Sequence, residues 1–439
     1  MNKSLIALLG AFLLCTPSAS AGELADSIKN DYDTYLGDLW DHFHRNPELS
    51  LVEFRTAARM AQELGAAGFE VTEQVGGTSL VAMMTNGDGP VVMMRADMDG
   101  LPVEERSGLP NESQATQRDP ITGNVVPVMH ACGHDVHITS LVGTARYMSR
   151  RKAEWSGTLM LVVQSAEERG MGARLMLEDG FFERFPVPDY ALALHVDTEY
   201  AAGTVNLVES PYASVDSVDI TVHGVPGHGA RPHQTKDPIV IASQIVLALQ
   251  TLVSRELPPR SPAVVTVGSF HAGAKHNVIS DRALLQLTVR NVDPETREHL
   301  LAGIERIAVN IGRAAGLPDD KLPDVVVADE YTPPVNNDMQ LGTRLRAAWS
   351  EAMGPDSVTA IPPKGMTGED FSRFMDPPVG AAVYWSVGGT PAEAIAQAEA
   401  GGPPVAGHHA PGFRIAPEPS VRTGVESTVV ALLELMGDQ

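Results

Sequence analysis

The chain has 439 residues and a formal net charge of −23, with 55 acidic against 32 basic residues. Such an acidic surface repels phosphate backbones and anionic lipid headgroups, and no run of lysine and arginine offsets it, so we expect no nucleic-acid and no membrane partner. The composition, 43% hydrophobic and 20% charged, is that of a globular protein, and the length suggests two domains or one large domain with an insertion.

The first 21 residues have the pattern of a cleaved signal peptide. One early lysine precedes an apolar stretch that ends at Cys15, and the small residues Ala-Ser-Ala end at Ala21. This stretch is too short to cross a bilayer, and we expect no later stretch to be long and apolar enough to do so. The sequence therefore predicts an exported protein, periplasmic or secreted after cleavage near Ala21.

The next part of the chain alternates between helix and strand patterns. Helical patterns cover residues 25–43, 53–67, 138–150 and 173–179. Short apolar runs typical of buried strands cover residues 79–84, 91–96, 157–164 and 190–195. This alternation predicts an α/β layer, and acidic and histidine residues follow the strands, where open α/β sheets bind their ligands.

The pattern changes after about residue 210. Strand patterns at 215–223, 263–270 and 283–289 and helix patterns at 239–252 and 294–314 give the order β-α-β-β-α. This order suggests a ferredoxin-like antiparallel sheet with helices on one side. Residues 328–334 look like a loop, after which the first kind of pattern resumes. We therefore predict a discontinuous larger domain, residues 22–210 and 326–439, interrupted by an inserted domain at 211–325.

Cys132 is the only cysteine beyond the predicted signal peptide. A lone thiol in an exported protein has no intramolecular disulfide partner, so packing or chemistry must explain it. It lies in the run HACGHDVH together with His130, His134 and His137. A single cysteine or histidine is more often a packed core residue, but a thiolate and an imidazole two positions apart suit zinc or a similar transition metal. His130 and His137 are either further ligands or partners of ligands.

Carboxylates or distant histidines must complete such a site, because a zinc site built from cysteines alone needs more thiols than this chain has. Glu167 and Glu168 directly follow one apolar strand, and His195 ends another. Of two adjacent acids, one can hold a metal while the other acts as general base toward a metal-bound water. A Glu-Glu pair alone is usually a solvated loop, so its weight comes from the histidines.

Two further pairs of polar residues lie in suggestive places. Asp97 and Asp99 end a third apolar strand, where a carboxylate can accept the second N–H of a ligating histidine. His408 and His409 lie in a predicted loop near the C-terminus, where an exposed histidine pair without function is equally compatible with the pattern.

Nine segments occur in an order that is similar to one family of enzymes. They are RADMDGLPVEE, MHACGHDVHIT, SAEERGMGARLML, ALALHV, GHGARPHQTKDPI, HNVIS, TVRNVDPETRE, TGEDFS and HHAPGF. The combination resembles the hippurate hydrolase and indole-acetyl-amino-acid hydrolase group of the aminoacylase and carboxypeptidase G family of dinuclear metallopeptidases. The resemblance covers Tyr35 to Leu435. It implies a zinc-exopeptidase-like α/β catalytic domain, a mixed sheet flanked by helices, with an inserted ferredoxin-like domain for dimerisation or as a lid.

The resemblance implies two divalent metal ions in each subunit. By their positions, the metal-bridging thiolate is Cys132, and the remaining ligands are His134, Glu168, His195 and His409. A thiolate favours zinc, while carboxylates and imidazoles also accept manganese, nickel or cobalt.

The resemblance also implies roles for residues that hold no metal. Glu167 matches the general base and Asp97 the acid that orients the site, while His408 is expected to be a bystander. His228 matches a histidine that stabilises the oxyanion, often in the partner subunit's site, and the inserted domain is expected to make a homo-oligomer. The substrate carboxylate is then expected to bind Asn277 and Arg290.

The implied function is hydrolysis of the amide bond of N-acyl amino acids or short peptides, giving a carboxylic acid and a free amino acid. The main alternative is a periplasmic metal-binding protein without turnover. A serine hydrolase and a nicotinamide enzyme are disfavoured, since the sequence contains no G-x-S-x-G and no strand followed by G-x-G-x-x-G. The acyl group and the amino acid remain open, because distant loops form the pocket walls.

Overall fold

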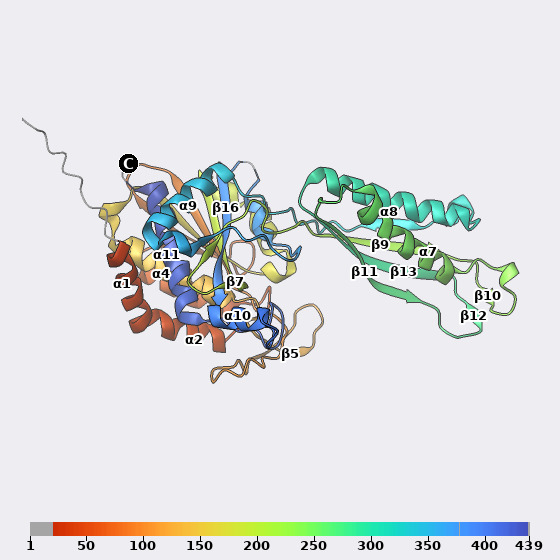
Figure 1. Ribbon diagram of the computed structural model, residues 1–439, viewed down its shortest axis with the longest axis horizontal. Coiled ribbons are helices and arrows are strands. Elements are labelled where there is room, and N and C mark those ends of the chain that lie inside the picture. Colours follow the sequence, from red (N-terminus) through yellow and green to blue (C-terminus); the bar gives the residue numbers. More distant parts are fainter. Residues whose placement is uncertain (1–20, 377, 438–439) are drawn as a thin grey trace, which may run out of the picture.

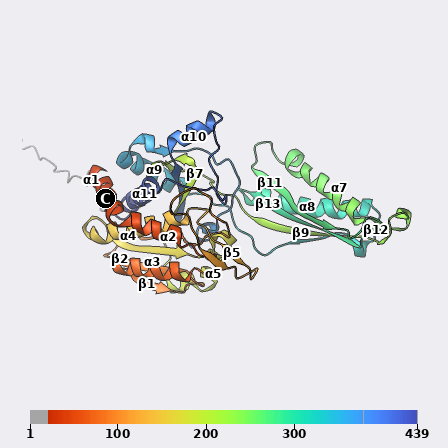
Figure 2. The same ribbon diagram turned by 90° about the horizontal axis from the view of Figure 1, so that it is seen from below.

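The computed structural model of the protein describes residues 21–376 and 378–437. The predicted signal peptide, residues 1–21, lies outside the described residues except for its last one. Figure 1 and, after a quarter turn, Figure 2 show a larger region with a sheet between helices and a narrower region extending away from it.

The larger region is built on an eight-stranded mixed sheet with the order β1-β2-β6-β3-β7-β16-β8-β15. Its central strands β6, β3, β7 and β16 pair in parallel, whereas β1, β2 and β8 add antiparallel pairs. The strands are β1 Glu70–Glu73, β2 Leu80–Asn86, β3 Val91–Asp97, β6 Gly157–Gln164, β7 Tyr190–Ala201, β8 Val205–Asn206, β15 Val358–Thr359 and β16 Ala381–Thr390. A separate hairpin pairs β4 Thr116–Arg118 with β5 Val125–Pro127.

Helices cover both faces of this sheet, which explains why its central strands are apolar almost throughout. In β6, Leu159 and Leu161 belong to one core cluster, while Met160 and Val162 between them belong to another on the opposite face. The helices of this region are α1 Ala21–Asp31, α2 Gly37–Arg45, α3 Phe54–Ala66, α4 His134–Arg150, α5 Gly172–Glu178, α6 Phe181–Arg184, α9 Met339–Met353, α10 Ala392–Glu399 and α11 Pro417–Met436. A π-helical turn, Tyr32–Leu36, joins α1 to α2, so the predicted first helix is nearly continuous.

The smaller region has the ferredoxin-like arrangement expected from its pattern. Its four-stranded sheet has the order β11-β13-β9-β14, entirely antiparallel, and its core packs the sheet against two helices. The elements are β9 Asp216–His223, α7 Pro238–Thr251, β11 Ala263–Ala272, β13 Arg282–Asn291, α8 Pro294–Ala314 and β14 Asp324–Val327. A short ladder of β10 Gly227–His228 with β12 Val278–Ile279 lies at the end far from the larger region (Figure 1).

Two details differ from the expectations. The small sheet does not end at residue 325, because β14 pairs with β9 as far as Val327. The expectation of no later membrane-length apolar stretch was wrong on composition, since Pro238–Glu256 has a mean hydropathy of 1.4 and the length to span a membrane. This helix is apolar on opposite faces: Ile241 and Ile245 pack into the core of the smaller region, whereas Val240 and Leu247 are exposed.

Candidate metal centre and its cavity

The parallel strands of the large sheet bring distant polar side chains to one edge. β3 ends in Asp97, β6 ends in Gln164 just before the glutamate pair, and β7 carries His195. Because β3 lies between β6 and β7 and pairs in parallel with both, the carboxyl ends of the three strands meet. Ligands of open α/β sheets bind at this edge.

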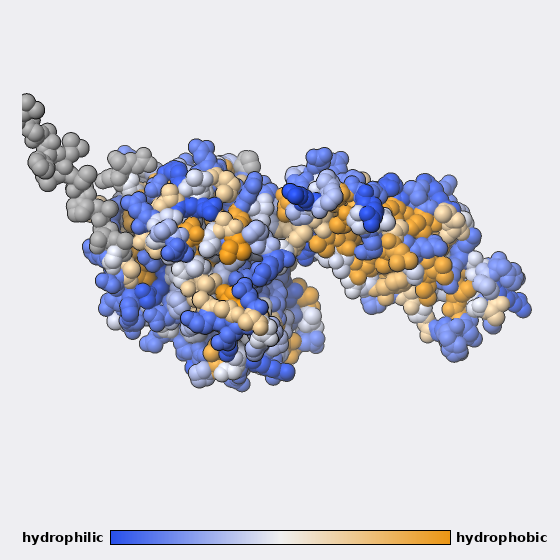
Figure 3. Space-filling model, viewed as in Figure 1, coloured by the Kyte–Doolittle hydropathy of each residue, from blue (hydrophilic) through white to orange (hydrophobic). Residues whose placement is uncertain are grey.

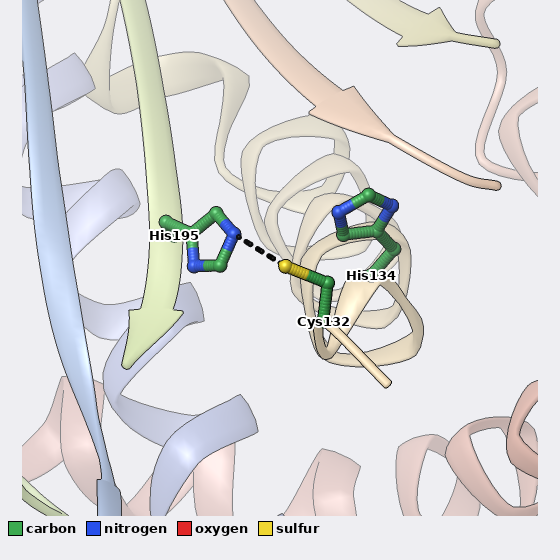
Figure 4. A group of neighbouring side chains, drawn as sticks. All are labelled: Cys132, His134 and His195. Carbon is green, nitrogen blue, oxygen red and sulfur yellow. Dashed lines mark hydrogen bonds between the residues drawn. The ribbon is translucent and has the colours of Figure 1, made fainter. Parts of the chain in front are cut away.

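A glycine shapes the turn between the thiol and the first histidine. Gly133 has φ of +82° and directly precedes α4, which begins at His134. A Cβ atom at this glycine would come within 2.3 Å of Cγ1 of Val196, so the close approach to β7 requires glycine as well. This turn places Cys132 and His134 beside the strand that carries His195, as Figure 4 shows.

The imidazole of His195 is oriented toward the thiol of Cys132. Its Nδ1–H donates to the carbonyl oxygen of Val196 at 2.6 Å, which leaves Nε2 to face the thiol sulfur at 3.4 Å (Figure 4). A backbone partner of this kind fixes the tautomer of a metal-binding histidine. Cys132, His134 and His195 are all buried, and their ligand atoms lie within 4.8 Å of one another.

His134 and Glu168 have buried polar atoms that find no hydrogen-bond partner among the described residues. These are both ring nitrogens of His134 and Oε1 of Glu168, which lies 3.9 Å from Nε2 of that histidine. Buried polar atoms without partners are rare and costly. Since imidazole, carboxylate and thiolate are the donors that zinc and related ions prefer, these residues fit a metal centre.

The histidine pair of the C-terminal loop closes the outer side of this cluster. His409 has φ of +63°, and its backbone N–H donates to the carbonyl oxygen of Ala131 at 2.8 Å. Its Nε2 lies 3.2 Å from Oε2 of Glu168, in a group that includes the thiol. His408, the expected bystander, is nevertheless close, with Nδ1 at 3.5 Å from the sulfur of Cys132. The structure therefore brings both imidazoles to the site.

The other two histidines of the HACGHDVH run differ from His134, although His137 lies in one compact group with His134 and Asp97. His137 donates from Nδ1 to Asp97 at 2.5 Å and accepts from the backbone N–H of Val196 at 2.8 Å, so both nitrogens are engaged. His130 is buried, and burial lowers its pKa to about 4. We interpret His137 as a partner of the site and not as a ligand.

The expected orienting acid, Asp97, belongs to a fully buried network around Arg95. The guanidinium donates to Asp97 at 2.6 Å and to Glu369 at 2.8 Å. Tyr384 donates to the same glutamate at 2.7 Å. Glu369 and Asp370 each have an oxygen in one compact group with Glu167, so this network forms the wall behind the expected general base.

Asp99 contacts the ligands more directly than Asp97 does. Its Oδ1 lies 3.4 Å from Nδ1 of His134, whereas Asp97 lies 3.7 Å from Nε2 of the same ring. Asp99 also accepts the backbone N–H groups of Glu167 at 3.1 Å and Glu168 at 3.2 Å. The orienting role that the resemblance gives to Asp97 is therefore shared with Asp99 in the structure.

The carboxylates give this cluster a strongly negative field. Burial opposes protonation of His134, but the neighbouring Asp97 and Asp99 raise its pKa to about 10. Burial, together with the carboxylate of Glu168, raises the pKa of the Cys132 thiol. Burial and the charge of Glu369 raise the pKa of Glu167. Bound divalent cations would offset this field and stabilise the thiolate.

The cluster opens into a cavity of about 550 Å³ between the two regions. Arg290 of β13 reaches it from the smaller region, half-buried, with its Nε donating to Thr288 at 3.0 Å. The lining residues are Cys132, Glu167, Glu168, Arg169, Gly170, His195, Asp197, Tyr212, Val215, Ser217, Arg290, Glu330, Thr332, Thr367, Gly368, Glu369, Asp370, His408 and His409. A volume of this size suits a small-molecule substrate.

Two expected substrate residues do not reach this cavity within one chain. Both residues are exposed: His228 belongs to β10, and Asn277 directly precedes β12 of the same ladder, where its carbonyl oxygen accepts the N–H of Gly229 at 2.9 Å. This ladder lies at the far end of the smaller region, so the two residues are near each other but away from the cluster (Figure 1). The reason is that the smaller region extends away from the larger one.

Two residues that sequence reasoning left without a role lie at the site: Tyr212 and Glu369. Glu369 lies in the TGEDFS segment. Tyr212 lines the cavity with its ring 6.1 Å from that of His195, and nothing in the sequence around it indicates this.

Comparisons with known proteins agree with this geometry. Hippurate hydrolase of Campylobacter jejuni is 37% identical over 336 residues, covering 76% of this chain and 83% of that protein. N-acetyl-L-cysteine deacetylase of Bacillus subtilis is 33% identical over 351 residues, covering 79% of each chain. A crystal structure described as a dinuclear metal binding peptidase of the M20 family from Bacillus subtilis superposes with a TM-score of 0.73 at 26% identity, covering 93% of this chain and 99% of that one.

The family itself follows from the length of the match. The model of the peptidase family M20/M25/M40 matches residues 93–400, which include Cys132, His134, Glu168, His195 and the smaller region but not His409. Together with the relatives above, the match shows that the chain belongs to the peptidase family M20/M25/M40.

Proposed function

We propose that the protein hydrolyses the amide bond between an acyl group and an amino acid, or the peptide bond of a short peptide. The family membership makes it a metallo-hydrolase that acts on amide bonds. The observation that carries the specific proposal is the position of Glu167, whose carboxylate lines the cavity beside His134 and Glu168. A protein that only bound metal would need Glu168 as a ligand but would not need the adjacent carboxylate of Glu167.

The residues that would hold the metal ions are the following five, the first of them as a thiolate: Cys132, His134, Glu168, His195 and His409. When bound, two divalent ions would lower the pKa of a water molecule and polarise the carbonyl of the amide. Zinc is the proposed metal because a thiolate is among the donors, with manganese, nickel or cobalt as the alternatives for the test. A Cys132→Ser variant should lose metal before it loses its fold.

The side chains of this protein then move the proton and hold the substrate. The carboxylate of Glu167 takes the proton of the attacking water and delivers it to the nitrogen of the leaving amine. The guanidinium of Arg290, which reaches the same cavity, binds the substrate carboxylate with its planar set of donors.

His228 and Asn277 require a second chain to take part in this reaction. We propose a homodimer in which the ladder of one subunit reaches the cavity of its partner. The supporting features are the exposed residues Val240 and Leu247 of α7 and the edge position of β11 in its sheet. Figure 3 shows hydrophobic residues gathered on the face of the smaller region where α7 and β11 lie. Export to the periplasm or medium, with cleavage near Ala21, belongs to the same proposal.

The test is a hydrolysis panel of N-acyl amino acids, including hippurate and N-acetyl and indole-acetyl conjugates, together with dipeptides. The protein is assayed as purified, after chelation, and after addition of zinc, manganese, nickel or cobalt. Cleavage that disappears on chelation and returns with one metal is the expected result. Metal binding without cleavage of any substrate would instead support the alternative of a metal-binding protein without turnover.

A further inference from the structure

The turn that carries the glutamate pair is held from behind by two buried carboxylates. Three successive backbone N–H groups point at them. The N–H of Ala166 donates to Oε1 of Glu53 at 2.9 Å. The N–H groups of Glu167 and Glu168 donate to the two oxygens of Asp99 at 3.1 and 3.2 Å. Every backbone donor from 166 to 168 is therefore bound to a carboxylate.

This turn has a backbone conformation that needs such support. Ala166 has φ of +50°, in the left-handed region that non-glycine residues seldom adopt. Residues of this kind cost on the order of 1 kcal/mol or more and persist when the surroundings determine them. The conformation turns the chain sharply at the end of β6, so that Glu167 and Glu168 face the cavity.

Of the two carboxylates that bind the turn, Glu53 lies outside the candidate metal centre. Its side chain is fully buried and does not line the cavity. Besides the N–H of Ala166, it accepts the hydroxyl of Thr78 at 2.5 Å and the N–H of Leu51 at 2.9 Å. Leu51 is itself strained, with φ of +73°. The strained residue Leu51 thus helps to orient the carboxylate of Glu53, which in turn binds the strained residue Ala166.

The same short segment also holds the second carboxylate. The hydroxyl of Ser50 donates to Oδ2 of Asp99 at 2.6 Å. Ser50, Leu51 and Glu53 precede helix α3, and they lie 113 positions or more before the turn that they support. One segment far away in the sequence therefore orders both carboxylates that bind the turn.

We propose that Glu53, assisted by Ser50, is a positioning residue that fixes the peptide turn of Glu167 and Glu168 and thereby places the general base and a metal ligand. The assignment rests on the proposed function of these two glutamates. Glu53 touches neither substrate nor metal, and it acts through the N–H of Ala166.

Two substitutions of Glu53 separate position from charge. In Glu53→Gln, the amide oxygen still reaches the N–H groups of Leu51 and Ala166, and the hydroxyl of Thr78 can turn to accept from the new NH₂ group. In Glu53→Asp, the charge is kept but the carboxylate is withdrawn by one methylene and no longer reaches Ala166. A positioning role predicts that the aspartate variant is the worse enzyme, whereas a role of the charge alone predicts the reverse.

The experiment compares the two full-length variants with the wild type. The measurements are kcat and KM on a substrate that the wild type cleaves, the metal content, and hydrogen exchange of a peptide that covers residues 165–168. We expect Glu53→Asp to lower kcat about 10- to 100-fold with little change in KM, the range typical of residues that orient metal ligands. The amides of 166–168 should exchange faster, and Glu53→Gln should restore both values toward the wild type.

Glu48 provides the matched control. It is also a buried carboxylate before α3, but it accepts from the N–H and hydroxyl of Thr56 and makes no contact with the turn. Glu48→Asp should lower the melting temperature without faster exchange at 166–168 and without a loss of kcat. If Glu53→Asp does not fold, Ser50→Ala, which removes a single hydroxyl, should show the same pattern of exchange and kcat with smaller changes.

Either of two results would overturn the proposal: unchanged exchange at 166–168 in Glu53→Asp, or a Glu53→Gln variant as impaired as the aspartate one. If the wild type cleaves no substrate, the proposed function fails, but hydrogen exchange and metal content still decide whether Glu53 positions the turn.

Discussion

In the larger region, Cys132, His134 and His195 are buried side chains with ligand atoms within 4.8 Å of one another. In the smaller region, His228 and Asn277 are exposed at the two-stranded ladder of β10 and β12, far from that cluster. Metal ligands have to be held in place before the cation arrives, so the core of the large sheet supplies them. Residues that bind a substrate must also let it enter the cavity, and the residues expected to do so lie on the separate smaller region. Of the smaller region, Arg290 of β13 and Ser217 of β9 already line the cavity.

The largest expected effect belongs to the buried part of this comparison. Glu167→Gln should lower kcat by about 10²- to 10⁴-fold, since it removes the general base. Metal content should stay at the wild-type level, because the five proposed ligands remain. Steady-state kinetics and metal analysis of the same preparation check both statements. A Glu167→Gln variant that retains more than a tenth of the wild-type kcat would show that another group accepts the proton.

For the exposed residues of the smaller region, we expect a loss of activity that a second subunit can restore. His228→Ala should lower kcat about 10²- to 10³-fold, the usual cost of one oxyanion donor. Mixed dimers of a His228→Ala chain and a Glu167→Gln chain should regain activity, because one of their two sites then has both an intact base and an intact histidine. Dimers of each variant alone serve as controls. No regain in verified mixed dimers would place His228 in the site of its own chain, or outside the reaction.

Arg290 tests the boundary between the two regions. Arg290→Ala should raise KM about 10- to 100-fold with little change in kcat, because it removes a charge-assisted bond of about 1.5–3 kcal/mol to the substrate carboxylate. Arg282→Ala, on the same strand but exposed and not lining the cavity, is the control and should leave KM unchanged. Loss of kcat at unchanged KM in Arg290→Ala would contradict the assignment.

The last prediction concerns the stability of the larger region, and we expect the smallest effect on catalysis here. His44 lies 2.8 Å from Asp135 and 3.3 Å from Glu105; burial opposes its charge, but the two acids raise its pKa from 6.5 to about 10. Its contribution to stability is therefore complete below about pH 6.5 and is lost as the pH rises through 10. His44→Ala should lower the free energy of unfolding by about 3 kcal/mol at pH 6.

Thermal melts of wild type and variant from pH 6 to pH 11 check this prediction, and the difference between them should shrink toward alkaline pH. His42→Ala, on the same helix α2 but exposed and without an ion pair among the described residues, is the control and should cost far less. A difference that grows with pH would mean that His44 is buried in its neutral form.

Much of the fold could be predicted because each element carries its own periodicity. The helix over 294–314 and the strand over 157–164 end where the pattern ends. The order β-α-β-β-α of the smaller region is that of the structure as far as α8, after which β14 adds a fourth strand to the sheet. The expectation of no later membrane-length stretch failed at Pro238–Glu256. This stretch is apolar both on the side that packs on the small sheet and on the exposed side.

The same holds for the metal centre only in part. Clustering in the HACGHDVH run was enough to single out Cys132 and His134. Position at the end of an apolar strand singled out Glu168 and His195, because parallel strands end at one edge of the sheet. These patterns were not enough to separate Asp97, which ends β3, from Asp99 two residues later, and the two acids divide the contacts to His134 between them.

By itself, the sequence determined which segments form helices and strands, which family the chain resembles, and which residue types can bind metal. Tertiary structure alone decided that His137 is fully engaged, that His228 lies far from the cavity of its own chain, and that Glu53 supports a turn 113 positions later. The physical reason is that periodicity records only whether a side chain is buried. Which buried polar groups meet depends on how distant segments pack.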